Sequence, residues 1–133
     1  MAKKLHVLVV DDQIFNIVVL EDLLANLGNV EVVTACNGKE ALEKVENEAQ
    51  RGDYFELVFM DCNMPVMDGF DASKGIRDMF KQKKILKDPY ICAVTAYTTD
   101  GFKKKCFACG MDEFLSKPIT SDKINQVIAK LKR

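Results

Sequence analysis

The sequence lacks the features that are typical of membrane-spanning and nucleic-acid-binding proteins. Its 133 residues include no tryptophan, one histidine and three prolines, and the formal net charge is only -1. Without a charge excess, no overall field favours nucleic acid or an anionic membrane, so charge-based chemistry has to come from local clusters. The apolar run over residues 5–10 is too short for a signal peptide or a membrane span. We therefore expect a soluble cytoplasmic protein or the cytosolic part of a membrane-anchored one.

A disulfide framework is not indicated either, because the five cysteines are an odd number in apolar surroundings. Free thiols in a reducing compartment are the simplest interpretation. Cys106 and Cys109 form a C-x-x-C pair, but no second pair accompanies it and His6 is the only histidine. A zinc or redox site is therefore not favoured, and we expect the thiols to behave as small buried or half-buried hydrophobic side chains.

Apolar runs and amphipathic stretches alternate five times along the chain. Short β-branched runs predict strands over residues 5–10, 30–35, 57–60, 90–94 and 113–115. Apolar side chains at helical spacing predict helices over 14–27, after Asn37, over 70–80, over 102–108 and around 124–131. We expect the basic stretch after residue 80 to extend or fray the third helix. The pattern predicts an α/β fold with one doubly wound parallel sheet and helices on both faces.

Polar side chains follow four of the predicted strands at the point where each strand ends. Asp11 and Asp12 follow the first strand, Asp61 the third, Thr95 ends the fourth, and Lys117 follows the fifth. Ligands of open α/β sheets bind at the carboxyl ends of the strands, so these groups should share one rim. Each residue alone would be an ordinary loop or surface residue, whereas their joint placement predicts a functional site.

The chemistry of this rim follows from its charges. Three carboxylates within a few ångströms repel one another, which raises carboxyl pKa values or requires a cation. Their hard oxygen atoms suit Mg²⁺, which offsets the repulsion and lets an anionic phosphate approach. One aspartate can then act as a nucleophile and form an acyl phosphate. Lys117 and Thr95 can stabilise the transferred group by charge and by hydrogen bonding.

The sequence resembles a known family over nearly its whole length. The chain is similar to the receiver domain of two-component response regulators in the segments VLVVDD, LVFMDCNMPVMDGF, AVTAY and FLSKPI. The resemblance implies a flavodoxin-like fold of five strands in the order 2-1-3-4-5 with five helices. It also implies that residues 1–133 form one receiver domain with a core of about residues 5–132.

The resemblance assigns roles to the acidic residues at matching positions. Asp61 is implied to be the phosphoacceptor, Asp12 the direct Mg²⁺ ligand, and Asp11 a ligand acting mainly through water. The backbone carbonyl of Asn63 would complete the protein's share of the metal shell, in which Mn²⁺ could replace Mg²⁺. The side chain of Asn63, two residues after the phosphoacceptor, would also influence the lifetime of the phosphoryl group.

Further roles fall on the remaining motif residues. Lys117 would pair with the carboxylate or the phosphoryl group, and its bond to Pro118 is expected to be cis. Thr95 would be the switch hydroxyl, and Phe114 would be the switch aromatic ring. Because Phe114 lacks a hydroxyl, its rotamer would be governed by packing alone. We hypothesise that the bulky Tyr97 hinders an attacking water and lengthens the phosphoryl lifetime.

The motif segments look more like receivers of hybrid histidine kinases than like free-standing regulators, an impression to which Asn16 contributes. The implied function is phosphorelay signalling, with a histidine kinase or histidine phosphotransfer protein as partner and without direct nucleic-acid or membrane contact. The domain would catalyse its own phosphorylation and dephosphorylation without being a conventional enzyme, as a monomer or a phosphorylation-dependent dimer. The partner is expected to dock near the first helix. With Phe15, Ile17 and Val19, this helix has more apolar residues than a single buried face requires.

Three alternatives remain at this point. A dehalogenase-type aspartyl phosphohydrolase shares the nucleophile, Mg²⁺, threonine and lysine, but would want a second aspartate at the position of Asn63. A flavin- or nucleotide-binding module could share the sheet, although no glycine-rich phosphate loop follows the first strand. A degenerate receiver could act only as a protein-interaction module, against which the complete acidic set argues.

Overall fold

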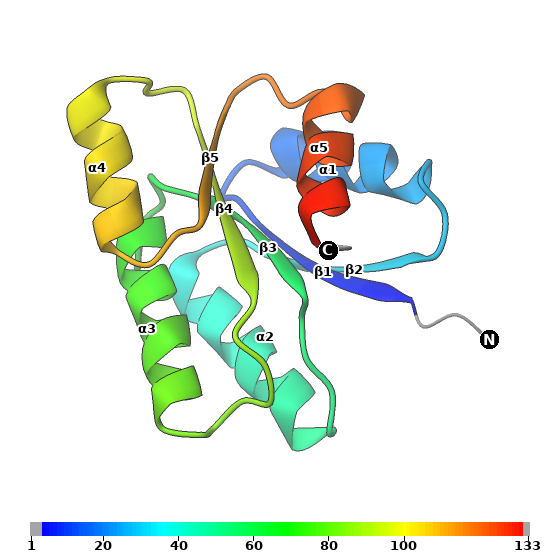
Figure 1. Ribbon diagram of the computed structural model, residues 1–133, viewed down its shortest axis with the longest axis vertical. Coiled ribbons are helices and arrows are strands. Elements are labelled where there is room, and N and C mark those ends of the chain that lie inside the picture. Colours follow the sequence, from blue (N-terminus) through cyan, green and yellow to red (C-terminus); the bar gives the residue numbers. More distant parts are fainter. Residues whose placement is uncertain (1–3, 132–133) are drawn as a thin grey trace.

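The computed structural model describes residues 4–131 and contains five strands that alternate with five helices (Figure 1). The strands are β1 (Leu5–Val10), β2 (Val30–Ala35), β3 (Leu57–Asp61), β4 (Tyr90–Thr95) and β5 (Glu113–Ser116). The helices are α1 (Ile14–Ala25), α2 (Gly38–Gln50), α3 (Gly69–Lys81), α4 (Asp100–Ala108) and α5 (Ser121–Leu131). No helix within the described range is both long and apolar enough to cross a membrane.

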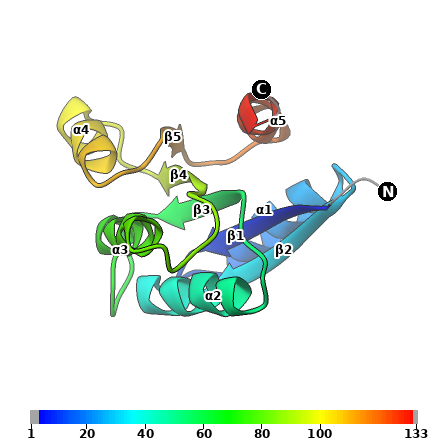
Figure 2. The ribbon, with the colours of Figure 1, turned by 60° about the horizontal axis from the view of Figure 1, so that its bottom comes forward.

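The strands form one parallel sheet in the order β2-β1-β3-β4-β5, which confirms the predicted fold class and strand order. Helices α1 and α5 cover one face, and α2, α3 and α4 cover the other, as Figures 1 and 2 show. Side chains of successive strand residues point to opposite faces. Leu8 and Val10 of β1 therefore pack under α2 and α3, whereas Val7 and Val9 pack under α1 and α5.

The ends of several elements differ from the predicted ones. Helix α1 ends at Ala25, two residues early, because the N–H of Gly28 turns back to the carbonyl of Ala25 in a final tight turn. Helix α3 ends at Lys81, so only the first residue of the basic stretch extends it, and Lys83 beyond it has a positive φ of 60°. Helix α4 starts at Asp100, because the Thr99 hydroxyl accepts the N–H of Phe102 and caps it. The expected core ended at residue 132, which lies outside the described residues.

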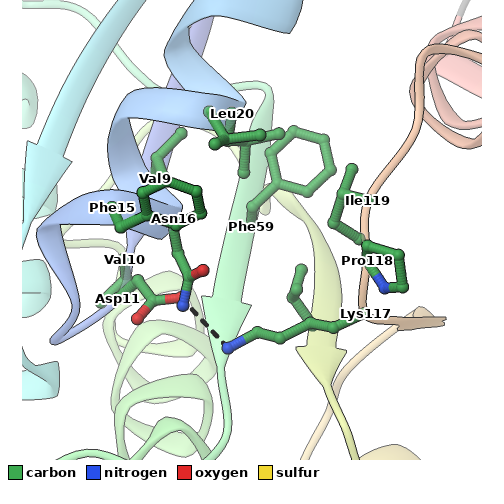
Figure 3. Close-up of a pocket in the computed structure, with 12 residues that line it drawn as sticks. Val9, Val10, Asp11, Phe15, Asn16, Leu20, Phe59, Lys117, Pro118 and Ile119 are labelled. Atoms are coloured by element: carbon green, nitrogen blue, oxygen red, sulfur yellow. Dashed lines mark ion pairs between the residues drawn. The ribbon is translucent and has the colours of Figure 1, made fainter.

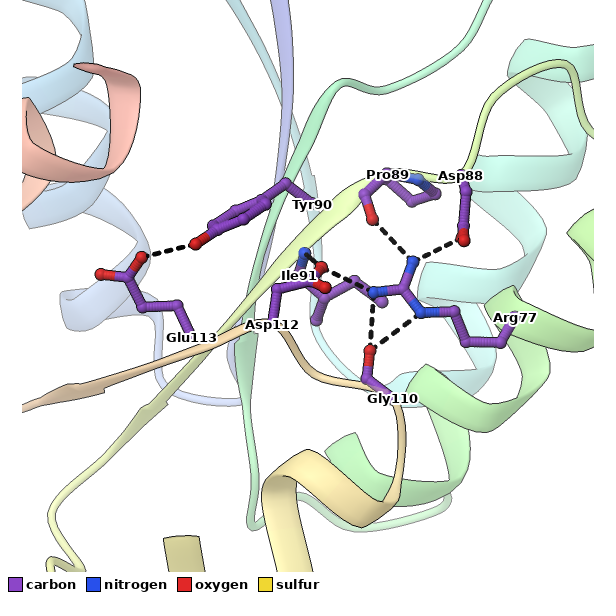
Figure 4. A network of polar contacts seen from close by, with 8 residues as sticks. All are labelled: Arg77, Asp88, Pro89, Tyr90, Ile91, Gly110, Asp112 and Glu113. Atoms are coloured by element: carbon purple, nitrogen blue, oxygen red, sulfur yellow. Dashed lines mark hydrogen bonds and ion pairs between the residues drawn. The ribbon is translucent and has the colours of Figure 1, made fainter. Parts of the chain in front are cut away.

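An arginine on α3 holds together the loops that precede β4 and β5 (Figure 4). The guanidinium of Arg77 donates to the carbonyls of Gly110 and Pro89 and pairs with the carboxylates of Asp88 and Asp112. A planar group with five N–H donors can serve several acceptors at once, which a lysine could not do in this geometry. This network fixes the end of the sheet opposite the carboxyl ends of the strands.

A second polar cluster lies at the same amino-terminal end of the sheet. His6 of β1 lies 3.3 Å from a carboxylate oxygen of Glu31, 3.4 Å from Asp53 and 3.7 Å from Glu48. These residues come from β2, from the end of α2 and from the loop after it. The cluster therefore ties three neighbouring segments together, at the end of the sheet away from the strand ends that carry Asp11 and Asp61.

Candidate functional site

The carboxyl ends of β1 and β3 bring three aspartates together, as the sequence predicts. Asp11 and Asp12 follow β1, and Asp61 is the last residue of β3. Each contributes a carboxylate oxygen, and these oxygens lie within 4.8 Å of one another. Asp11 and Asp61 are buried, while Asp12 is exposed at the mouth of the cluster. The cluster thus combines two fixed carboxylates with one that solvent reaches.

Local turns orient the two buried carboxylates. Oδ1 of Asp11 accepts the backbone N–H of Gln13 at 2.9 Å, and Oδ1 of Asp61 accepts that of Asn63 at 3.3 Å. Short aspartate side chains commonly bond to the backbone two residues further on. In both residues this bond occupies one oxygen and leaves Oδ2 to face the lysine described next.

Lys117 supplies the positive charge of the site. Its Nζ lies 3.3 Å from Oδ2 of Asp11 and 3.8 Å from Oδ2 of Asp61, and Figure 3 shows it reaching toward Asp11. The backbone N–H of Lys117 donates to the carbonyl of Thr95, and the Lys117–Pro118 peptide bond is cis. The lysine therefore enters the cluster from the end of β5, across the sheet from β1.

The environment of Asp61 changes its ionisation. Burial raises the pKa of Asp61 from its ordinary 3.8 to about 7, and the negative charge of Asp11 acts in the same direction. The positive charge of Lys117 and the N–H of Asn63 lower this pKa but do not cancel the rise. The carboxylate of Asp61 is thus destabilised unless a further positive charge arrives.

Thr95 and Tyr97 lie at and just after the carboxyl end of β4, the strand that pairs with β3. Thr95 ends β4, is buried, and accepts the backbone N–H of Tyr97 at its Oγ1 atom, 3.1 Å away. Tyr97 is 58% exposed, and its ring centroid lies 5.4 Å from that of Phe102 on α4. The hydroxyl is therefore held at the rim, while the tyrosine ring leans toward α4.

Phe114 of β5 makes a contact that the sequence did not indicate. Its half-buried ring packs against the core on the α4 side of the sheet. The Nζ atom of Lys103 on α4 lies 5.3 Å from the ring centroid, which is a cation–π distance. What governs the rotamer of Phe114 stays a prediction, and this cation–π contact lies beside the packing that we expect to govern it.

The loop between β3 and α3 approaches the phosphoacceptor candidate more closely than the sequence reveals. The N–H of Gly69 donates to the carbonyl of Cys62, and a Cβ atom on Gly69 would lie only 2.2 Å from the backbone oxygen of Asp61. Val66 has a φ of 71°, and the N–H of Met67 donates to the carbonyl of Pro65 around it, as in a strained γ-turn. Gly69 thus allows the loop to pack on Asp61. The sequence gives little indication of this role, because a glycine at the start of a helix is common.

The first helix carries an apolar surface beside the site. Phe15 is 73% exposed and Val19 is 37% exposed. Ile17 is buried in the core, so the expectation that it belongs to this surface is wrong. Ile14 and Val18 are exposed instead. A cavity of about 340 Å³, drawn in Figure 3, lies between this helix and the β5–α5 loop, and Phe15, Asn16, Val19 and Ile119 are among its lining residues.

The cysteines are free, as expected, but they do not all lie in apolar surroundings. Cys62, Cys92, Cys106 and Cys109 are buried, whereas Cys36 is exposed and its thiol donates to a carboxylate oxygen of Glu40. Cys62 and Cys106 lie with their sulfur atoms 3.8 Å apart, and burial raises the pKa of the Cys62 thiol. The four buried thiols act as packing side chains, because burial disfavours their thiolate forms.

Fold and site together define a class of protein: doubly wound α/β domains with carboxylates and an amine gathered at the carboxyl ends of the strands. Residues 7–129 match the response regulator receiver domain, and the chain belongs to that family. It is a signalling domain of the two-component phosphorelay type, which decides against the aspartyl phosphohydrolase and the nucleotide-binding module.

Individual relatives agree with this assignment. The chain is 39% identical over 127 residues to hybrid signal transduction histidine kinase L of Dictyostelium discoideum, which covers 93% of this chain but only 7% of the kinase. The chain thus spans a small part of the length of that relative. Hybrid kinases B and K of the same organism show the same relation, with 6% and 10% of their lengths covered.

Two solved structures show close similarity of fold. The receiver domain of the histidine kinase CKI1 from Arabidopsis thaliana, complexed with Mg²⁺ and BeF3⁻, is 32% identical with a TM-score of 0.83, covering 96% of this chain and 89% of that chain. The receiver domain of Ssk1 from Saccharomyces cerevisiae, in a co-crystal with the histidine phosphotransfer protein Ypd1, is 28% identical with a TM-score of 0.84. That match covers 98% of this chain and 90% of the other.

Proposed function

We propose that Asp61 is the phosphoacceptor of this receiver domain and that it takes a phosphoryl group from a phosphohistidine. The observation that carries the proposal is the position of Asp61 at the end of β3, with Lys117 Nζ 3.8 Å from one of its oxygens and a pKa raised to about 7. A carboxylate made unstable by burial and by its neighbour Asp11 gains stability when cations and a phosphoryl group enter the site.

The donor set of the site fits a hard divalent cation. Asp11, Asp12 and Asp61 present oxygen atoms within 4.8 Å of one another, and oxygen ligands are those that Mg²⁺ prefers. We assign Asp12, Asp61, the backbone carbonyl of Asn63 and, through water, Asp11 to this cation, with Mn²⁺ as an alternative. When bound, the ion would neutralise the carboxylates and the incoming phosphoryl oxygens. The Mg²⁺ in the similar CKI1 receiver supports this assignment.

The side chains around Asp61 divide the remaining work of the transfer. A carboxylate oxygen of Asp61 attacks phosphorus, the bond from phosphorus to the histidine nitrogen breaks, and an acyl phosphate forms while the partner's imidazole retains the bonding electron pair. The ammonium of Lys117 stabilises charge on the transferred group, and Thr95 donates its hydroxyl hydrogen to a phosphoryl oxygen. Water later cleaves the acyl phosphate and restores the carboxylate.

The switch is proposed to run from Thr95 to Phe114. When Thr95 moves toward the phosphoryl oxygens, Phe114 of the neighbouring strand repacks into the space released. Because these residues lie on paired strands, with Ala93 of β4 opposite Phe114 and Thr95 opposite Ser116, the shift biases the surface of α4, β5 and α5. Self-catalysed phosphorylation and dephosphorylation suit a signalling domain and do not require turnover of an external substrate.

We infer that the partner is a histidine kinase or a histidine phosphotransfer protein that docks on the exposed apolar side of α1. The Ssk1 receiver bound to Ypd1 supports this kind of partner, and the likeness to hybrid kinases supports residues 1–133 as one receiver domain within a longer signalling protein. The free thiols suit a reducing compartment such as the cytoplasm. A monomer, or a dimer formed on phosphorylation, fits the proposal.

Mass spectrometry of the intact protein tests the proposal. Wild type and Asp61→Asn are incubated with a small-molecule phosphodonor, with and without Mg²⁺. A labile gain of one phosphoryl group that requires Mg²⁺ and is absent from Asp61→Asn is the expected result. If neither a small donor nor a phosphorylated histidine protein produces this gain, the domain is a degenerate receiver that acts only through protein contacts.

A further inference from the structure

A lysine on the first turn of α5 holds the loop that carries Lys117. The Nζ atom of Lys123 donates to the carbonyl of Ser116 at 2.7 Å and to the carbonyl of Pro118 at 3.1 Å, and it lies 3.3 Å from the Ser116 hydroxyl. An ammonium has three N–H donors, so these oxygens can occupy all of them. Lys123 is half-buried, and its own N–H donates to the Thr120 hydroxyl, which fixes the start of the helix.

The carbonyls that Lys123 binds lie on either side of Lys117. Ser116 precedes Lys117 and Pro118 follows it, while the N–H of Lys117 itself donates to the carbonyl of Thr95 at 2.9 Å. The backbone of Lys117 is therefore restrained on both sides. Its side chain, in contrast, has four rotatable bonds and has to place Nζ between the carboxylates of Asp11 and Asp61.

We propose that Lys123 is a positioning residue for phosphoryl transfer: by clamping Ser116 and Pro118 it holds the backbone from which Lys117 reaches Asp61. The proposal rests on the proposed function, because it concerns the rate at which Asp61 is phosphorylated. A charged donor makes stronger hydrogen bonds than a neutral one, so the clamp resists movement of the loop. Loss of the clamp lets Lys117 drift, and small misplacements of catalytic groups reduce rates strongly.

The same helix offers a matched control. The Nζ atom of Lys130 on α5 lies 2.8 Å from a carboxylate oxygen of Glu113, at the start of β5 and away from Lys117. Lys130→Met removes an ammonium and a polar contact between α5 and β5, as Lys123→Met does, but leaves the loop around Lys117 unchanged. Lys123→Arg keeps a charged donor in place of the ammonium.

Two measurements on the full chain test the proposal. Trace acetylation with mass-spectrometric detection reports how freely the amine of Lys117 reacts, independently of phosphorylation. The rate of phosphorylation by a small donor, at saturating Mg²⁺ and with thermal unfolding followed in parallel, reports the effect on transfer. We expect Lys123→Met to label several-fold faster at Lys117 and to be phosphorylated roughly tenfold more slowly, with most of the rate recovered in Lys123→Arg and no change in Lys130→Met.

The proposal is overturned if Lys123→Met labels at Lys117 and is phosphorylated at the wild-type rates. It is also overturned if Lys130→Met is phosphorylated as slowly as Lys123→Met, because the effect would then come from general loosening of α5. If the wild-type protein takes up no phosphoryl group, it is the proposed function that fails. In that case the labelling of Lys117 alone decides whether Lys123 positions it.

Discussion

Asp61 is the residue in which burial and charge conflict most strongly. Asp61 is 6% exposed and has Asp11 as a neighbour, so its pKa rises to about 7. An ordinary aspartate, with a pKa near 3.8, would be ionised at every physiological pH. The site thus accepts a cost in stability in order to hold a carboxylate that cations and phosphoryl transfer can stabilise.

This cost predicts a pH-dependent gain in stability for Asp61→Asn. Between about pH 4 and pH 7 the folded state keeps a proton on Asp61 that the unfolded chain releases, so the free energy of unfolding of the wild type falls as the pH rises. Asparagine does not ionise and retains an oxygen for the N–H of Asn63. We expect the variant to be more stable at pH 8 by roughly 2 kcal/mol, half of the 4 kcal/mol that three pKa units represent, because solvent screens the site.

Urea unfolding at pH 4.5 and pH 8, with a chelator present, measures this difference. The gain should be largest at pH 8 and should shrink toward pH 4.5, where Asp61 is protonated in the folded state. A variant that is no more stable than the wild type at pH 8 would contradict the account of Asp61.

Tyr97 predicts a second effect at the residue scale. Its backbone N–H binds the Thr95 hydroxyl and its exposed ring contacts Phe102, and we expect the ring to obstruct a water molecule that approaches the acyl phosphate. Tyr97→Ala should shorten the phosphoryl lifetime several-fold, as followed by the decay of the phosphorylated mass after the donor is removed. Tyr97→Phe keeps the ring and should decay like the wild type; a Tyr97→Ala protein that loses its phosphoryl group no faster would refute the hindrance hypothesis.

The sequence predicts correctly those residues of the site that backbone position alone brings together. Asp11, Asp61 and Thr95 could be placed at one rim because parallel strands align their carboxyl ends. The contacts of Lys103 with Phe114 and of Lys123 with Ser116 could not be predicted from the sequence, because long side chains reach partners that only the folded chain brings near.

At the scale of elements, the loop from β3 to α3 is the segment on which the site depends most. It folds back on the last residue of β3 through Gly69, and the N–H of Gly38, the first residue of α2, donates to the carbonyl of Met67. The left-handed conformation of Val66 shows that this loop is held in place despite backbone strain. The loop therefore connects α2 and α3 to the backbone of Asp61.

Gly69→Ala should damage both folding and phosphorylation. The new Cβ atom would lie 2.2 Å from the backbone oxygen of Asp61, so the loop or the strand end has to move. We expect a loss of about 2–3 kcal/mol in the free energy of unfolding, as overpacked substitutions show, together with slower phosphorylation.

Gly101→Ala is the matched control, because a Cβ atom there meets open space within α4. It should raise the free energy of unfolding by about 0.5–1 kcal/mol and leave phosphorylation unchanged. Urea unfolding and intact-mass phosphorylation assays compare the two variants. Equal behaviour of both would show that the close approach of Gly69 to Asp61 has no functional weight.

The existence and order of all ten elements follow from the hydrophobic pattern, whereas their ends depend on local bonds. Helix α1 stops at Ala25 although Leu27 continues the apolar pattern, because the final turn closes onto the carbonyls of Leu24 and Ala25. Helix α4 starts early because Thr99 caps it. Such bonds compete with the hydrophobic signal over one or two residues, and composition does not decide between them.

For the whole molecule, the acidic cluster and the proposed output surface lie at different parts of the sheet. The acidic cluster opens beside α1, whose outer surface exposes Ile14, Phe15 and Val18, while the proposed output surface of α4, β5 and α5 lies at the other edge of the sheet. Exposed apolar side chains gathered on one helix are typical of a protein contact. This arrangement lets a partner bring its phosphohistidine to Asp61 without covering α4.

Phe15→Ser should therefore separate docking from chemistry. Loss of an exposed aromatic side chain at the contact should slow transfer from a phosphorylated histidine phosphotransfer protein roughly tenfold, while phosphorylation by a small donor stays near the wild-type rate. Phe80→Ser, which removes a 40% exposed phenylalanine on α3, serves as control and should change neither rate. If Phe15→Ser transfers at the wild-type rate, docking does not use this side of α1.

Asp61, rather than another carboxylate of the cluster, is the residue that we propose carries the phosphoryl group. Reduction of the phosphorylated protein with borohydride converts an aspartyl phosphate into homoserine, which peptide mass spectrometry can locate. Homoserine is expected at position 61, only after treatment with donor and Mg²⁺, and none at positions 11 or 12. Homoserine at position 11 or 12, or unmodified Asp61 in a protein that has gained a phosphoryl group, would contradict it.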